Sequence, residues 1–191
     1  ARPGRVPRPK LIGRLNAGLY HRLTLVSAPA GYGKSTLAAE WLAQIELPVA
    51  WLSLEQADDD PVRFFSYLVG ALQRVDAAIG AELARALTAG QLPLPEVIIA
   101  TLVNDLLSAN TSCVVVLDDF QWIQNESILA TLQGLLIHYP FPFHLVILTR
   151  EDPPLPLARW RAQDQMTEIR AADLRFDAEE TARFLREGMR L

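Results

Sequence analysis

The stretch Ala28-Pro-Ala-Gly-Tyr-Gly-Lys-Ser-Thr36 decides the fold of this chain. It reads Ala28-x-x-x-x-Gly33-Lys34-Ser35, which is the Walker A pattern with alanine in place of its first glycine. A short apolar run precedes it and a helical pattern follows, so backbone N–H groups and a helix N-terminus can surround a di- or triphosphate. The stretch therefore predicts a phosphate-binding loop between a buried strand and a helix.

The residues of this loop receive separate predicted roles. Lys34 is expected to reach the β- and γ-phosphates, and the Ser35 hydroxyl to ligate Mg²⁺. Gly31 and Gly33 let the backbone approach a phosphate without a Cβ. A glycine-rich turn with an incidental lysine is the alternative, and a second motif argues against it. The predicted nucleotide-binding residues of the loop are Ala30, Gly31, Tyr32, Gly33, Lys34, Ser35 and Thr36.

The second motif is the apolar run Val114–Leu117 followed by Asp118 and Asp119. A buried strand that ends in paired carboxylates is typical of a Walker B element, although a surface turn could also carry two carboxylates. We expect Asp118 to hold Mg²⁺ together with Ser35, directly or through water. Asp119 is the candidate to polarise the attacking water, and its side chain is shorter than a glutamate's. We therefore expect slow hydrolysis.

A third candidate is Arg150, which follows the apolar run His144–Leu148. Its guanidinium fork matches phosphate geometry, so it could lean over the terminal phosphate and report whether that phosphate is present. A plain surface arginine is the alternative. Together, Lys34, Asp119 and Arg150 form the predicted catalytic set, and Arg150 is also assigned to nucleotide binding.

Short apolar runs alternate with longer amphipathic segments, which is typical of α/β proteins. Asp60 followed by Pro61 is typical of a helix start. The acidic run Asp58–Asp60 is therefore better explained by helix capping than by a metal site. Residues 80–91 stay ambiguous, and further helices are expected over 95–109 and 127–138. The pattern predicts a three-layer P-loop NTPase fold with a mostly parallel five-stranded sheet between helices. The expected strands are Leu23–Ser27, Val49–Leu54, Cys113–Leu117, His144–Leu148 and Met166–Ile169.

With 191 residues, the chain is long enough for one substantial core. Residues 23–176 are interpreted as the NTPase core, and residues 1–22 as a basic N-terminal arm that contributes to the nucleotide site. A solvated, partly disordered arm is the alternative. Residues 177–191 read as the truncated start of a helical subdomain, because Asp177 and Glu180 form a capping box before Phe184 and Leu185.

The formal net charge of -4 gives no general attraction to nucleic acid. The single cysteine, Cys113, opens an apolar run and is expected to be a small core residue in a reducing compartment. His21, His138 and His144 have no metal-ligand spacing. No apolar stretch reaches the roughly 20 residues that span a bilayer. These features predict a cytoplasmic protein without a membrane segment.

Taken together, the motifs resemble the STAND class of signalling ATPases. The chain is similar, from about Pro9 onward, to the N-terminal nucleotide-binding domain of bacterial MalT-type, LuxR-family transcriptional regulators. The Pro-rich segment behind Arg150 is the most specific part of this resemblance. The segments that carry it are Val26–Ser35, Val49–Leu54, Leu117–Asp119, Leu148–Arg159 and Leu174–Phe176.

This resemblance implies a regulatory switch in which ADP holds a resting form. ATP with Mg²⁺ and an inducer would favour a form that self-associates in the full-length protein and activates transcription. Ala28 is normal for that group, whereas Gln121 stands where relatives often carry a histidine. The sensor domain and the C-terminal DNA-binding helix-turn-helix of such regulators are absent from these residues, so DNA binding would require parts beyond this chain.

Two other functions remain open on the sequence. A P-loop kinase or other phosphotransferase could close Arg159 and Arg161 over a transferred phosphate, but no acceptor-binding feature is visible. A fragment that has lost nucleotide binding could instead serve as an interaction scaffold.

Overall fold

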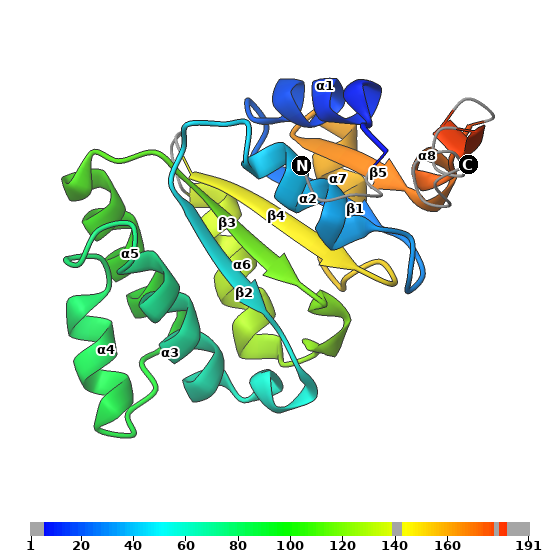
Figure 1. Ribbon diagram of the computed structural model, residues 1–191. Helices are drawn as coiled ribbons and strands as arrows, with labels where there is room; N and C mark the ends of the chain where they lie inside the picture. Colours follow the sequence, from blue (N-terminus) through cyan, green and yellow to red (C-terminus); the bar gives the residue numbers. More distant parts are fainter. Residues whose placement is uncertain (1–5, 139–142, 178–179, 183–191) are drawn as a thin grey trace.

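The fold is built on a sheet of five parallel strands, seen in the computed structural model of Figure 1. The structure describes residues 6–138, 143–177 and 180–182. The strand order is β2-β3-β4-β1-β5, which confirms the predicted mostly parallel sheet. The strands are β1 (Leu23–Ser27), β2 (Val49–Ser53), β3 (Cys113–Asp118), β4 (Phe143–Thr149) and β5 (Met166–Arg170).

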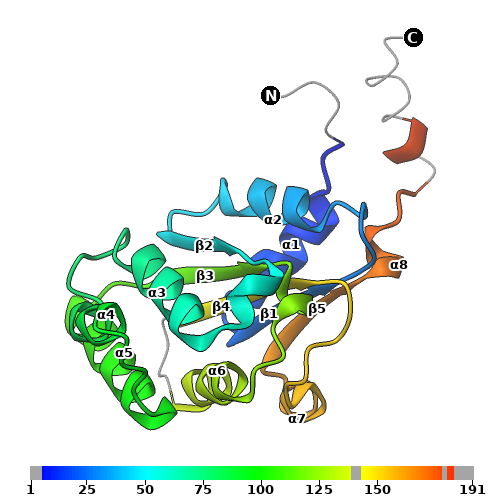
Figure 2. The same ribbon diagram turned by 90° about the horizontal axis from the view of Figure 1, so that it is seen from below.

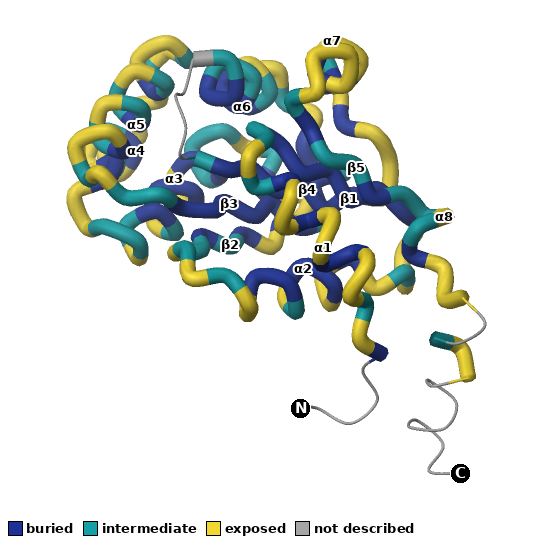
Figure 3. Tube along the Cα trace, turned by 90° about the horizontal axis from the view of Figure 1, so that it is seen from above, coloured by how far each residue is buried: buried dark blue, intermediate teal, exposed yellow. Residues whose placement is uncertain are grey.

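The three central strands are buried along almost their whole length, because helices cover both faces of the sheet. They form the dark centre of the trace in Figure 3. The edge strand β2 instead alternates between buried and partly exposed residues. This arrangement explains why β1, β3 and β4 read as nearly continuous apolar runs in the sequence.

Helices lie on both sides of the sheet, which gives the predicted three layers (Figure 2). On one side, α1 and α2 pack with one set of sheet residues, whereas α3, α5, α6 and α7 pack on the opposite face. The short α4 packs against α3 and α5. The helices are α1 (Pro9–Gly18), α2 (Lys34–Leu42), α3 (Pro61–Leu72), α4 (Ala81–Thr88), α5 (Pro95–Ala109), α6 (Glu126–His138), α7 (Leu157–Ala162) and α8 (Ala171–Leu174).

The helix α1 corrects the interpretation of the basic arm as partly disordered. Pro9 occupies its first turn, and Leu11, Ile12 and Leu15 are buried against the sheet side that α2 also covers. At its last residue, Gly18, a Cβ atom would lie 2.5 Å from the Thr167 hydroxyl oxygen, so only glycine permits this close approach to β5. The alternative of a disordered arm is therefore wrong for residues 9–18.

The acidic run before α3 has the structural role that its sequence favours. Asp60 caps α3 by accepting a hydrogen bond from the Arg63 N–H at 2.9 Å. Asp59 accepts from the backbone N–H groups that precede α6, and the buried Asp58 accepts from Arg63 Nε at 2.6 Å. These three carboxylates therefore fix the chain after β2.

Two other expectations concern helix boundaries. The ambiguous stretch 80–91 contains α4, and α6 begins at Glu126, one residue before the predicted Ser127. Near the chain end, Asp177 and Glu180 exchange the two hydrogen bonds of the predicted capping box, at 2.8 and 3.0 Å. The rest of the helix expected there, with Phe184 and Leu185, lies outside the described residues.

Two single residues have the core positions expected for their type. Cys113 is buried at the start of β3, as predicted for a small core residue. His144, in β4, is buried and hydrogen-bonded to the Thr24 hydroxyl at 2.9 Å and to the His21 carbonyl at 2.8 Å. Within the described part of the chain, the helices are too short or too polar to cross a membrane.

Candidate nucleotide-binding site

The loop between β1 and α2 has the backbone conformation that its glycines permit. Gly31 and Gly33 adopt φ values of 81° and 78°, a region that favours glycine. The helix α2 begins at Lys34, directly after Gly33, so its first N–H groups point into the loop. The predicted strand–loop–helix arrangement is therefore present, with the positive end of the helix dipole at the loop.

Lys34 is buried at the mouth of this loop. Its ammonium group donates to the carbonyl oxygens of Ala28 at 2.8 Å and Pro29 at 3.1 Å. Burial lowers the pKa of this amine, and the nearby Arg150 lowers it further, whereas Asp119 and Asp118 oppose the shift. The side chain is thus held over the loop by weak neutral acceptors, so anionic oxygens would be stronger partners for it.

Ser35 and Asp118, the two predicted metal ligands, lie side by side although they come from α2 and β3. The Ser35 hydroxyl is hydrogen-bonded to the Asp118 carboxylate. Burial raises the pKa of Asp118, while the hydrogen bonds from Ser35 and from the Asp119 N–H, at 3.0 Å, lower it. A buried carboxylate next to a hydroxyl oxygen fits a hard divalent cation such as Mg²⁺, because the cation would offset the cost of burying the charge.

Asp119 lies beside Arg150 and Gln121. Its Oδ1 atom accepts a hydrogen bond from Gln121 Nε2 at 2.9 Å and lies 3.8 Å from Arg150 Nη2. The Gln121 amide oxygen in turn accepts from the Arg150 backbone N–H at 3.3 Å. Asp119 itself adopts a left-handed conformation with φ of 57°, which costs a non-glycine residue about 1–2 kcal/mol. Gln121, the departure from the family pattern, therefore bridges the ends of β3 and β4.

Several of these residues, but not Asp118 or Gln121, line one hollow, which we call the phosphate cavity. It has a volume of about 380 Å³ and lies at the phosphate-binding loop. All three predicted catalytic residues reach it. It is lined by Ala30, Gly31, Gly33, Lys34, Ser35, Thr36, Asp119 and Arg150.

A second hollow, the apolar cavity, adjoins the first and has a volume of about 450 Å³. Tyr32, which does not line the phosphate cavity, lines this one instead. The two cavities share Gly31, Gly33 and Thr36, so a single ligand could extend from one into the other. The apolar cavity is lined by Val6, Arg8, Gly31, Tyr32, Gly33, Thr36, Leu37, Glu40, Leu174 and Phe176.

Arg8 joins two segments, one before α1 and one at α8, that wall the apolar cavity. Its guanidinium donates to the carbonyl oxygens of Asp173 at 2.8 Å and Leu174 at 2.9 Å, and its Nε atom pairs with Glu180 at 2.8 Å. The same group lies over the Phe176 ring, 5.2 Å from its centroid. Residues before α1 and after α8 are therefore held together next to the loop.

Sequence reasoning did not connect Arg8 with Phe176 and Glu180, the side chains that it contacts. Arg8 lies in the arm that is predicted to contribute to the nucleotide site, and Leu174–Phe176 was noted only as part of a resemblance. The available signal was the position of Arg8, which directly precedes Pro9 and an apolar helix pattern. Nothing local in the sequence pairs this arginine with Asp173, Leu174, Phe176 or Glu180.

The helix α2 begins at Lys34, and Asp118 at the end of β3 lies against Ser35. This arrangement is typical of P-loop NTPase domains. The all-parallel sheet places this chain in the same class. The chain belongs to the AAA ATPase domain family, whose model matches residues 10–148.

Longer bacterial proteins contain a similar domain. The HTH-type transcriptional regulator MalT of Vibrio parahaemolyticus is 34% identical over 190 residues, covering 97% of this chain and 21% of the relative. The serine/threonine-protein kinase PknK of Mycobacterium tuberculosis is 32% identical over 191 residues, covering 97% of this chain and 17% of the kinase. This chain thus spans about a fifth of the length of these curated relatives, and the predicted resemblance to MalT-type regulators is confirmed.

Solved structures share the fold. The Walker-type ATPase PABY2304 of Pyrococcus abyssi matches with a TM-score of 0.63 and 17% identity, over 97% of this chain and 58% of that one. The STAND protein PH0952 of Pyrococcus horikoshii, which has a tetratricopeptide repeat sensor, matches with a TM-score of 0.61 and 16% identity. That match covers 100% of this chain and 26% of the other.

Proposed function

We propose that this domain is the ATP/ADP-binding switch of a signal-responsive transcriptional regulator. The observation that carries the proposal is the phosphate cavity, which the phosphate-binding loop lines together with Asp119 and Arg150, while Asp118 lies behind it against Ser35. Arg150 comes from another strand than the loop and has a half-exposed side chain. It is therefore free to change partners when a γ-phosphate arrives, which a switch between ATP and ADP requires.

The nucleotide would extend across both cavities. Its phosphates would lie on the N-terminus of α2, where Lys34 exchanges the carbonyls of Ala28 and Pro29 for phosphate oxygens. Its base and ribose would enter the apolar cavity between Tyr32 and Phe176. Residues 1–22 would then contribute to the site through Val6 and Arg8, as an arm that closes one wall.

Slow hydrolysis is part of this proposal. A bound Mg²⁺ would supply charge neutralisation between the β- and γ-phosphates, and Ser35 and Asp118 are the residues that would hold it. Asp119 would orient the attacking water, but its carboxylate is shared with Gln121 and Arg150. A carboxylate that already accepts a hydrogen bond has fewer free positions with which to hold a water, so the domain would hydrolyse ATP slowly, as a switch requires.

The effect of the switch would lie in other parts of the protein. Similar domains form about a fifth of a regulator and a smaller share of a kinase, so the domain serves different attached activities. In this proposal the ATP-bound full-length protein self-associates in the cytoplasm and contacts DNA through a separate C-terminal domain. Residues 177–191 would begin the helical subdomain that transmits the change.

The proposal is tested by comparing ATP and ADP affinities with Mg²⁺ present, using titration calorimetry on the purified domain. Arg150→Ala should narrow the preference for ATP over ADP, because only ATP has the phosphate that Arg150 would contact. Arg159→Ala, an exposed arginine on α7, is the matched control and should leave the ratio unchanged. An unchanged ratio in Arg150→Ala would refute the sensor role.

Nucleotide binding itself has a separate test. ATP or ADP at 100 times its Kd should stabilise a binding-competent domain by about 2.7 kcal/mol. Unchanged melting curves together with silent calorimetry would favour an interaction scaffold, and phosphate transfer to a small-molecule acceptor would favour a phosphotransferase.

A further inference from the structure

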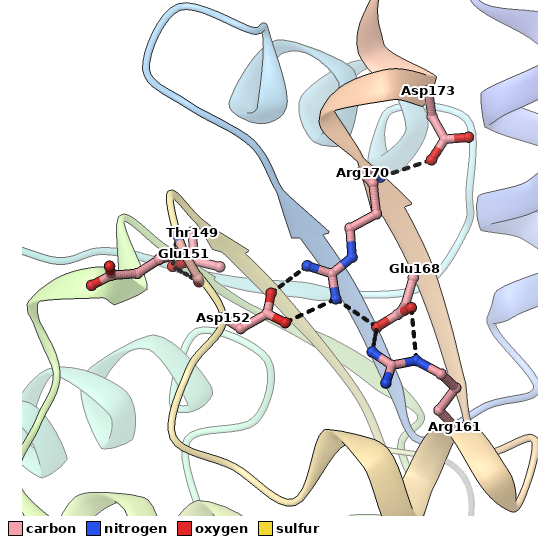
Figure 4. A network of polar contacts seen from close by, with 7 residues as sticks. All are labelled: Thr149, Glu151, Asp152, Arg161, Glu168, Arg170 and Asp173. Carbon is pink, nitrogen blue, oxygen red and sulfur yellow. Dashed lines mark hydrogen bonds and ion pairs between the residues drawn. The ribbon is translucent and has the colours of Figure 1, made fainter.

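A chain of ion pairs joins the segment after β4 to strand β5, as Figure 4 shows. Asp152 lies two residues after Arg150, and its carboxylate binds the Arg170 guanidinium through both oxygens, with Nη2 to Oδ2 at 3.1 Å. Arg170 ends β5, so this pair ties the segment to a fixed element of the sheet. Two parallel hydrogen bonds between planar groups also fix their relative orientation.

The pair continues into a network on the same edge of the sheet. Arg170 Nη2 contacts Glu168 at 2.8 Å, and Glu168 also binds Arg161 of α7 at 2.5 and 3.1 Å. The hydrogen bond from Arg170 holds the pKa of Asp152 below its usual range, and that from Arg161 does the same for Glu168. Both carboxylates therefore remain ionised and paired at neutral pH.

The residues on either side of Arg150 are also held by hydrogen bonds. Thr149 is buried, and its hydroxyl donates to the Glu151 carbonyl at 2.8 Å (Figure 4). Asp152 also contacts the Ser27 side chain, which ends β1 beside the phosphate-binding loop. On the other side, Gln121 accepts from the Arg150 N–H at 3.3 Å. The backbone of Arg150 is thus fixed from two directions, whereas its side chain is half exposed.

We propose that Asp152 and Arg170 are positioning residues for Arg150, setting the direction from which its guanidinium approaches the terminal phosphate. This inference rests on the proposed sensor role of Arg150. A merely stabilising role is a poor explanation for the pair, because the two side chains are 50% and 33% exposed and such ion pairs contribute little to stability. Their geometric effect is larger, since a small misplacement of a charged group strongly weakens its contact with a phosphate.

The test measures the ratio of ATP to ADP affinity in the purified domain with Mg²⁺ present. Asp152→Asn and Arg170→Ala should each lower this ratio, by about three- to tenfold, because the contact with the γ-phosphate depends on geometry. The melting temperature without nucleotide should stay close to that of the wild type. Arg170→Lys keeps the charge but cannot bind both carboxylate oxygens side by side, so it should give an intermediate ratio.

A double-mutant cycle separates positioning from a general electrostatic effect. In an Arg150→Ala background, Asp152→Asn should produce no further change, since the residue that it positions has been removed. Combining Asp152→Asn with Arg170→Ala should likewise add nothing to either single change. Glu82→Gln is the matched control, because Glu82 pairs with Arg85 at 3.6 Å on α4, far from the cavities.

The outcomes distinguish this inference from the function on which it rests. If Arg150→Ala lowers the ratio while Asp152→Asn and Arg170→Ala leave it at the wild-type value, the positioning role is overturned and the sensor role stands. Additive effects of Asp152→Asn and Arg150→Ala would also overturn it. An unchanged ratio in Arg150→Ala itself would overturn the sensor role and the positioning role with it.

Discussion

The phosphate cavity and the apolar cavity adjoin each other, yet they are built in different ways. The phosphate cavity is formed by the ends of three neighbouring strands, and most of its lining comes from one continuous loop. The apolar cavity depends on two segments that are far apart in the sequence, since 166 positions separate Arg8 from Leu174. The residues proposed to bind phosphate thus lie at the strand ends of the sheet, whereas the apolar cavity is walled by segments that are far apart in the sequence.

This difference has an energetic consequence. The wall of the apolar cavity depends on contacts between segments far apart in the sequence, among them those of Arg8, so these segments can separate while the sheet stays intact. Strand ends in the middle of a sheet open only with the whole fold. We therefore expect substitutions in the phosphate cavity to change which nucleotide binds, and substitutions in the apolar cavity to change how tightly any nucleotide binds.

The largest expected effect is a loss of stability in acid, and it tests whether both cavities depend on the sheet. Burial lowers the pKa of His144 in β4 to about 4. Below about pH 6.5, His144 takes up a proton in the unfolded chain, whereas in the folded protein it does so only near pH 4. The free energy of unfolding therefore decreases as the pH falls from about 6.5 to about 4, by about 3 kcal/mol. Denaturant unfolding at several pH values should show this slope.

His144→Gln should remove most of that slope, because glutamine does not titrate. Affinities for ATP and for adenosine should fall together in acid if both cavities rest on the sheet. If adenosine binding survives at a pH where ATP binding is lost, the apolar cavity does not depend on the strand that carries His144.

The next effect concerns the phosphate cavity alone. Lys34→Ala removes the ammonium group that lies over the loop, and a charge-assisted hydrogen bond contributes about 1.5–3 kcal/mol. ATP affinity should therefore fall by about ten- to hundredfold in calorimetry, with a smaller loss for ADP and none for adenosine. Lys10→Ala, an exposed lysine on α1, should change none of the three. Wild-type ATP affinity in Lys34→Ala would refute this placement of the phosphates.

The smallest effect concerns the apolar cavity. Phe176→Ala removes an aromatic wall, and the stacking of a base on an aromatic side chain contributes about 1–3 kcal/mol at most. Because Phe176 is partly exposed, we expect a loss of about fivefold, equal for ATP, ADP and adenosine. Tyr20→Ala removes an aromatic ring that is 81% exposed elsewhere and serves as the control. A selective loss of ATP would contradict a base-binding role.

The same difference explains what could be predicted from the sequence. The loop, Asp118 and Arg150 could be predicted to lie together because each lies at or just after the end of a strand, and parallel strands bring their carboxyl ends to one edge. The wall made by Arg8 and Phe176 depends on tertiary pairing that no local pattern encodes. In the basic arm, proline and glycine content suggested disorder, although the apolar spacing from Leu11 to Leu15 indicates a helix.

The left-handed backbone of Asp119 has a consequence for engineering. Glycine adopts this conformation freely, so Asp119→Gly would leave the unliganded fold as stable as before, or more stable by up to about 1 kcal/mol. A search for thermostable variants would therefore favour Asp119→Gly. This substitution would also remove the carboxylate that is proposed to orient the attacking water. Directed evolution of this domain should therefore select for heat resistance and nucleotide turnover together.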